Sequence, residues 1–198
     1  MLGGCSGQPS PAASPAAEIT ASPLRWLLLP EESRRLKELR TGRDTADFLE
    51  DFWRRRDPDP GSGVNECARR FRERSLAADR LYGEDGRRGS LTDRGRALVL
   101  LGPPPVLRYS QRRIPSWEPD RSGAKPSTHS RLVAVETWIY PLAGLSPRLA
   151  ALLAAEAAAQ AQDAAGAELV FLAESPRHTR LLEGERVLEL AARALIQK

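Results

Sequence analysis

The most restrictive feature of this sequence is a helical stripe of large apolar side chains that ends at a proline-rich turn. Four residues share one face of a helix by their spacing: Phe48, Leu49, Phe52 and Trp53. The segment 57–61, Asp-Pro-Asp-Pro-Gly, follows shortly and cannot continue a helix. A helix with three aromatic rings on one side must bury that side, so we expect it to be a central element of the core.

Two further helices are predicted on either side of this stripe. Pro30 suits the first position of a helix that runs to about Arg40, and Asp44 can cap the stripe helix. Another helix follows at about 65–82. Four acid-before-base pairs lie at i,i+4 in these segments: Glu31–Arg35, Glu50–Arg54, Asp51–Arg55 and Glu66–Arg70. Each pair adds only about 0.2–0.5 kcal/mol, and together they favour solvated helix faces over acid–base chemistry for these carboxylates.

The rest of the chain predicts a small sheet and a closing helix. The fully apolar run Ala97–Leu101 is predicted as a buried strand, and Leu24–Leu29 as a short strand or packing arm. The later elements are expected in this order: a strand at 132–140, an alanine-rich helix from Ser146, a strand at 168–173 and a helix at about 184–196. Helices followed by strands favour an α+β fold, with N-terminal helices packed on a small, mainly antiparallel sheet and a C-terminal helix.

The first residues point to the cell envelope. Met1-Leu2-Gly3-Gly4-Cys5 resembles the lipobox that ends a bacterial lipoprotein signal peptide, although the basic and apolar regions that should precede it are missing. Residues 6–21 are rich in Ser, Pro and Ala and predict a flexible tether. We therefore expect a start and tether over 1–22, a single domain over 23–198, lipidation at Cys5, and a location in the periplasm or outer membrane. The alternative is a cytoplasmic protein with a frayed start.

The net charge of +4 is concentrated in one segment. Residues 103–131 carry six basic and two acidic side chains, and they separate two predicted strands. A loop of this length is typical of a functional or a solvated segment. We interpret it as a candidate partner-binding loop, with Arg108, Arg112 and Arg113 beside Trp117 as an anchor. A basic loop is weaker evidence for nucleic acid than a basic face on an ordered element, so a protein partner is favoured.

Signals for catalysis are weak. The chain has two cysteines and no CxxC, and neither His129 nor His178 has a partner at metal-ligand spacing. No catalytic residue, metal, cofactor or small-molecule ligand is predicted. The alternative is an enzyme with a cleft between the sheet and the 103–131 loop, which would gather Arg94, Arg96, and His129 or His178 beside a carboxylate.

Three stretches resemble one known family. They are Phe48–Pro60 followed by Asn65-Glu66, then Gly89–Arg96 running into Leu100–Pro104, and finally Glu136-Thr137-Trp138-Ile139-Tyr140. Their order and spacing resemble the GWxTD domain, found in bacterial proteins that often look exported or lipid-anchored, over about residues 24–182. The signature tryptophan position holds Ser90 here. The resemblance implies no established activity and supplies no catalytic residues.

The turn Thr92-Asp93-Arg94-Gly95-Arg96 is the intact part of that signature. Thr92 and Asp93 can bond backbone N–H groups, and Gly95 permits a positive φ. Arg94 and Arg96 could pair with Asp93 or with a helix carboxylate. We interpret the turn as a structural clamp, with an anion or partner site as the alternative. The expectation for the whole chain is a non-enzymatic scaffold or interaction module of the bacterial envelope.

Overall fold

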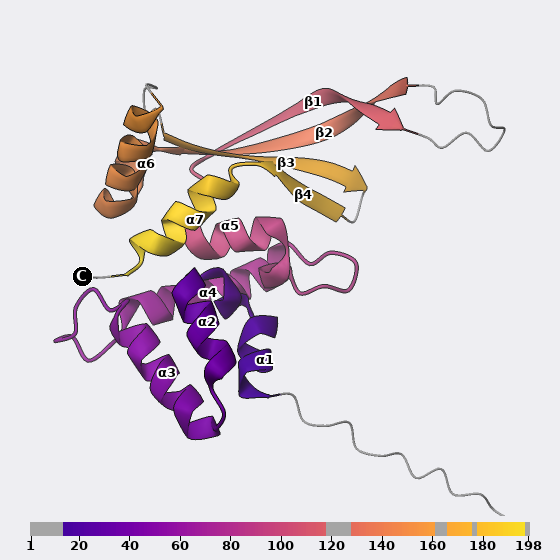
Figure 1. The fold of residues 1–198 in the computed structure, drawn as a ribbon. Coiled ribbons are helices and arrows are strands. Elements are labelled where there is room, and N and C mark those ends of the chain that lie inside the picture. Colours follow the sequence, from indigo (N-terminus) through magenta and orange to yellow (C-terminus); the bar gives the residue numbers. More distant parts are fainter. Residues whose placement is uncertain (1–13, 118–127, 161–165, 176–177, 197–198) are drawn as a thin grey trace, which may run out of the picture.

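The computed structural model describes residues 14–117, 128–160, 166–175 and 178–196. Its first part is helical (Figure 1), and the elements in chain order are α1 (Pro15–Ala21), the 3-10 turn η1 (Pro23–Trp26), α2 (Pro30–Glu38), α3 (Gly42–Arg54), α4 (Glu66–Leu81), η2 (Gly89–Leu91) and α5 (Asp93–Leu101). The second part contains β1 (Val106–Trp117), β2 (Thr128–Pro141), η3 (Leu142–Gly144), α6 (Pro147–Ala159), β3 (Gly166–Ser175), β4 (His178–Glu183) and α7 (Glu185–Ala194). The predicted α+β class is confirmed.

Side-chain caps fix where the N-terminal helices begin. Thr41, not Asp44, caps α3: its hydroxyl accepts from the Asp44 N–H at 3.1 Å, and the Asp44 carboxylate accepts from the Thr41 N–H at 2.9 Å. Asn65 caps α4 by accepting from the Ala68 N–H at 2.9 Å. Its amide also donates to the Trp53 carbonyl at 2.7 Å, so the start of α4 is tied to the end of α3.

The prediction of a buried strand at Ala97–Leu101 is wrong, because these residues form the second half of α5. Ala97, Leu98, Val99 and Leu100 are all buried. A helix that is covered on every side has a continuous apolar sequence, and periodicity cannot distinguish such a helix from a buried strand. Gly102 ends the helix with a φ of 86°, a conformation that favours glycine.

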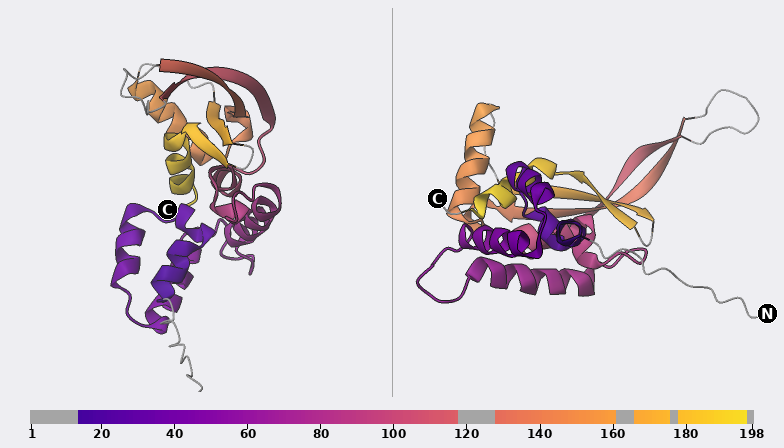
Figure 2. Two further views of the ribbon diagram at one scale, coloured as in Figure 1. Left: turned by 90° about the vertical axis from the view of Figure 1, so that its right-hand side faces the viewer. Right: turned by 60° about the horizontal axis from the view of Figure 1, so that its bottom comes forward.

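The sheet has the order β1-β2-β3-β4, and every neighbouring pair is antiparallel. The helices gather on one side of it, and the β1–β2 hairpin projects beyond β3 and β4 (Figure 2). Trp138 of β2 is fully buried at this helical side, with its ring centroid 5.6 Å from that of Tyr82 and 5.0 Å from that of Phe171. The main core therefore lies between the sheet and the helices.

The other side of the sheet carries a small apolar cluster of its own. Its buried members are Val133, Val135, Val170 and Leu172. Arg112 of β1 and Glu183 of β4 form an ion pair at 2.7 Å, although β2 and β3 lie between their strands. Three strand spacings amount to about 14 Å in a flat sheet, so both side chains must extend over this face and toward one another.

Several expectations from the sequence need correction. Residues 103–131 are not one long loop, because β1 and the start of β2 pair across this segment, and residues 118–127 lie outside the described residues. The tether is not continuous to residue 21, because Pro15–Ala21 form α1 and Ile19 is buried in the core. The apolar run at 24–29 is a packing arm that begins in η1, not a strand. Cys5 lies outside the described residues.

Candidate functional site

The Thr92–Arg96 turn is a clamp between three elements. The buried Thr92 hydroxyl donates to the Gly89 carbonyl at 2.8 Å and accepts from the Gly95 N–H at 3.1 Å. The Asp93 carboxylate accepts from the Leu181 N–H of β4 at 2.7 Å. The start of α5 is therefore joined to η2 on one side and to the sheet on the other.

Gly95 is required for a reason different from the predicted one. Its φ is not positive; instead, a Cβ added there would lie 1.7 Å from the Gly89 carbonyl oxygen. Close approach of two backbone segments, and not an unusual conformation, excludes a side chain at this position. Ser90 is fully buried, and its carbonyl accepts from the Trp26 indole N–H at 2.8 Å.

The two arginines of the turn point to different places. Arg94 pairs with Glu84 at 2.9 Å and with Glu136 at 3.4 Å. Arg96 pairs at 2.7 Å with Glu185 at the start of α7. Neither ion pair involves Asp93, so that expectation is wrong, whereas the pairing of Arg96 with a helix carboxylate is confirmed. Because the two guanidinium groups diverge, the turn does not form a joint anion site.

Two of the residues that would form the active site of the alternative enzyme, Arg94 and His178, lie beside Glu84. This buried carboxylate accepts from Arg94 and from the Thr179 N–H at 3.0 Å, and the His178 Nδ1 lies 3.7 Å away. Both Glu84 oxygens already accept a hydrogen bond, so a structural role accounts for this cluster of charged side chains. Arg96 lies elsewhere, and the side chain of His129 lies outside the described residues. Within the described residues, no group of three or more His, Cys, Asp or Glu side chains could hold a metal ion.

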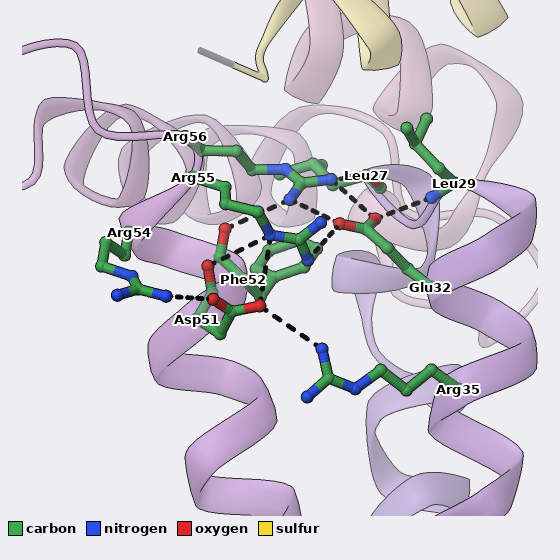
Figure 3. A network of polar contacts seen from close by, with 9 residues as sticks. All are labelled: Leu27, Leu29, Glu32, Arg35, Asp51, Phe52, Arg54, Arg55 and Arg56. Carbon is green, nitrogen blue, oxygen red and sulfur yellow. Dashed lines mark hydrogen bonds and ion pairs between the residues drawn. The ribbon is translucent and has the colours of Figure 1, made fainter. Parts of the chain in front are cut away.

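A buried ion pair between α2 and α3 is the strongest electrostatic feature that sequence reasoning missed (Figure 3). The Arg56 side chain is fully buried and that of Glu32 is 2% exposed, and they form two hydrogen bonds of 2.7 and 2.9 Å. Arg56 also donates to the carbonyls of Leu27 and Phe52 at 2.8 and 3.1 Å. Its guanidinium lies 3.7 Å from the centroid of the Phe52 ring, so the positive charge of Arg56 is buried against the aromatic core.

The neighbouring ion pairs extend this network to the surface. Arg55 donates to Glu32 at 2.9 Å and also reaches Asp51 at 3.3 Å, and Asp51 receives Arg54 and Arg35 as well. The hydrogen bond from Arg54, followed by the charges of the neighbouring arginines, lowers the pKa of Asp51 below its ordinary value despite partial burial. The run of three arginines after the aromatic stripe is the sequence feature that could have indicated this network. The i,i+4 pairing rule assigns partners to Arg54 and Arg55 only, Glu50 and Asp51, and it gives none for Arg56.

The predicted partner-binding residues lie on the projecting hairpin, but they do not form one cluster. In β1 the alternation of side chains places Arg108 and Arg112 on one face of the sheet and Arg113 on the other. Arg112 pairs with Glu183, and Arg113 donates to the Ser130 hydroxyl at 3.4 Å. The side chain of Trp117 lies outside the described residues.

The hairpin exposes apolar side chains that the sequence analysis did not single out. Tyr109 is 72% exposed, Leu132 59% and Leu107 47%. Leu107 is opposite Trp138, Tyr109 is opposite Glu136, and Leu132 is opposite Arg113, so all three lie on the face that carries Trp138. Near Trp138 that face is covered by helices, and toward the tip of the hairpin it extends beyond them (Figure 1). An apolar surface on a long edge strand is the kind of surface that binds another protein.

Comparison with known proteins identifies no relative of this chain. No protein-family model, curated protein or solved structure matches the chain. In the part of the chain that the structure describes, no helix is both long enough and apolar enough to span a bilayer.

Proposed function

We propose that the protein is a non-enzymatic interaction module that presents the β1–β2 hairpin to an acidic protein partner. The observation that carries this proposal is the exposure of Leu107, Tyr109 and Leu132 on one face of the β1–β2 hairpin, with Leu132 in the part that projects beyond β3. Aromatic residues and arginine are enriched at protein interfaces. The hairpin offers both: Arg113 lies on the same face as the three apolar side chains, and Arg108 and Arg112 lie on the opposite face of β1.

The edge position of β1 adds a second binding element. β1 pairs with β2 on one side only, and among the described strands none lies along its outer edge. A strand edge can accept an extended segment of a partner through backbone hydrogen bonds, with side chains on alternate positions giving specificity. Val106–Trp117 is long for an edge strand, so it provides many such positions.

The arginines of β1 favour an acidic protein over a second copy of this chain as the partner. Arg108 lies near the start of β1 and Arg112 and Arg113 lie in its middle; of the three, Arg112 is paired with Glu183. Antiparallel pairing of this edge with a second copy of itself would bring these guanidinium groups close together, and like charges opposite one another destabilise a sheet. An acidic strand would meet them favourably. The arginines therefore act against self-association and favour a different, acidic protein.

The state of the buried carboxylates supports a non-catalytic role. Glu32 and Glu84 are the buried carboxylates of the described chain, and each accepts hydrogen bonds at both oxygens. A general acid or base must face its substrate with a free position. These two groups instead hold α2 to α3 and α5 to the sheet.

The cell envelope is the proposed location. The support for it is the lipobox-like start at Cys5 and the resemblance to the GWxTD domain. Membrane fractionation of the full gene product, with a mass measurement of its N-terminus, tests it. We expect an envelope protein modified at Cys5, and an unmodified protein found only in the cytosol would contradict the location.

The interaction is tested with matched surface variants. Tyr109→Asp changes the hairpin, whereas Leu81→Asp changes a residue on α4 that is 65% exposed. We expect the wild type and L81D to retain the same acidic protein from an envelope extract and Y109D to lose it. Equal retention by all three proteins would show that the hairpin is not the binding surface.

A further inference from the structure

A pocket of about 230 Å³ lies between the end of α3, α4, α5 and the end of α7. Three arginines contribute to its wall: Arg56, Arg70 and Arg74. The other side of the wall is apolar and includes Phe71, Val99 and Leu195, and the Cys67 thiol also faces the pocket. The sequence did not indicate this site, because its walls come from six separate segments of the chain.

The charge in this pocket is only partly compensated. Arg56 is matched by Glu32, as described above. Arg70 and Arg74 form no ion pair with any residue that the structure describes, and Arg74 donates only to the carbonyls of Val99 and Leu100, at 3.3 and 3.2 Å. Burial, and next the charge of Arg70, lowers the pKa of Arg74 from its ordinary value. The guanidinium of Arg74 is thus held at a partly desolvated part of the wall, and exposed Arg70 lies one helical turn away at the rim.

An anion would relieve this repulsion. A guanidinium is planar and matches a carboxylate with two parallel hydrogen bonds. The charges of Arg56, Arg70 and Arg74 favour the thiolate of Cys67, and the negative charge of Asp57 opposes it. The charges that act on this end of the pocket are therefore mainly positive. The apolar wall opposite the arginines gives a hydrocarbon group a place to bind. Pockets for drug-sized ligands have about 300–1,000 Å³, so the occupant here is smaller.

We propose that this pocket binds a small amphiphilic carboxylate, with its head at Arg70 and Arg74 and its hydrocarbon body against Phe71, Val99 and Leu195. The geometry fits a short-chain carboxylic acid better than inorganic phosphate, because phosphate would leave the apolar wall without a partner. This site lies on helices, apart from the projecting hairpin. The binding of such a ligand is therefore independent of the interaction proposed above.

The first test is calorimetric titration of the full chain at pH 7 with octanoate and, separately, with octanol. The two probes share the hydrocarbon chain and differ in the charged head. We expect octanoate to bind at least tenfold more tightly than octanol. Arg70→Gln and Arg74→Gln should each weaken octanoate binding at least tenfold. Arg80→Gln, on the same helix outside the pocket, should leave it unchanged.

The second test locates the ligand. Cys67 is half-buried in the pocket, and burial raises the pKa of its thiol, so alkylation by iodoacetamide is followed at mildly alkaline pH by mass mapping of the Cys67 peptide. We expect octanoate to slow this alkylation in the wild type and in R80Q but not in R70Q. Arg70 is exposed, so R70Q is expected to fold even if R74Q does not. Unchanged octanoate affinity in R70Q, equal binding of octanol, or no protection of Cys67 would each overturn the proposal.

Discussion

Glu32→Gln tests the buried network of Figure 3 most severely. The substitution keeps the size of the side chain and removes its charge, so the Arg56 guanidinium loses its carboxylate partner while it stays fully buried. The acceptors that remain for it are neutral: the carbonyls of Leu27 and Phe52 and the amide oxygen of the new glutamine. Breaking a buried ion pair on one side costs about 3–5 kcal/mol. A domain of this size has a total stability of about 5–15 kcal/mol, so the loss is a large share of it.

The assay is urea unfolding followed by circular dichroism, with Asp51→Asn as the matched control. Asp51 also receives several arginines, but its side chain is 25% exposed and its partners are more exposed than Arg56. Surface ion pairs contribute about 0–1 kcal/mol. We expect E32Q to lose at least 3 kcal/mol and D51N less than 1 kcal/mol. Equal losses for the two variants would refute the argument that burial of Arg56 makes Glu32 important.

Further predictions concern the acid limit, the clamp and the indole contact. The pKa of Asp51 is lowered on folding, first through its hydrogen bond from Arg54; its stabilising effect should therefore be complete above about pH 4 and be lost as the pH falls through the folded pKa. The stability difference between D51N and the wild type should thus be largest at pH 7 and shrink as the solution is acidified, and a difference that grew on acidification would be inconsistent with this sign. Gly95→Ala should lower the free energy of unfolding by at least about 1–3 kcal/mol, because the new Cβ would meet the Gly89 carbonyl. In the same urea assay Gly144→Ala should change it by no more than about 0.5 kcal/mol, because nothing lies within 4 Å of the new Cβ. Trp26→Phe, which removes the indole donor to the Ser90 carbonyl, should cost about 1–3 kcal/mol, and an unchanged midpoint would show that this hydrogen bond contributes nothing.

The sequence predicted α2, α3 and α4, each of which has a polar side, but it missed the short helix α1 and assigned the apolar α5 to a strand. The aromatic stripe of α3 and the strand at β2 show their periods clearly because one face of each meets a different environment from the other. α5 is buried on nearly all sides and has no period to detect. β1 is the opposite case: both faces carry arginine or other polar residues, so its alternation is lost, and its pairing with β2 extends it well beyond the core.

The candidate site shows the same division between local and long-range information. The bond from the Gly95 N–H to the Thr92 hydroxyl joins neighbouring residues, and the sequence predicted that Thr92 accepts from a backbone N–H in this turn. The partners of Asp93 and Arg96 come from β4 and α7, far along the chain, so their identity could not be predicted. Arg56 was missed because nothing in its own segment indicates that Glu32 will be buried beside it. Ion pairs between separate elements depend on packing, which local patterns do not encode.

Site-specific photo-crosslinking tests the central claim most directly. A photoreactive phenylalanine analogue is placed in the full chain at Tyr109, at Leu132 or, as the control, at Leu81, each of which is well exposed. After irradiation in the native envelope extract, adducts are identified by mass spectrometry. The interaction-module account predicts that positions 109 and 132 crosslink the same acidic protein and that position 81 does not. No adduct at either hairpin position, or the same adducts at all three, would contradict it.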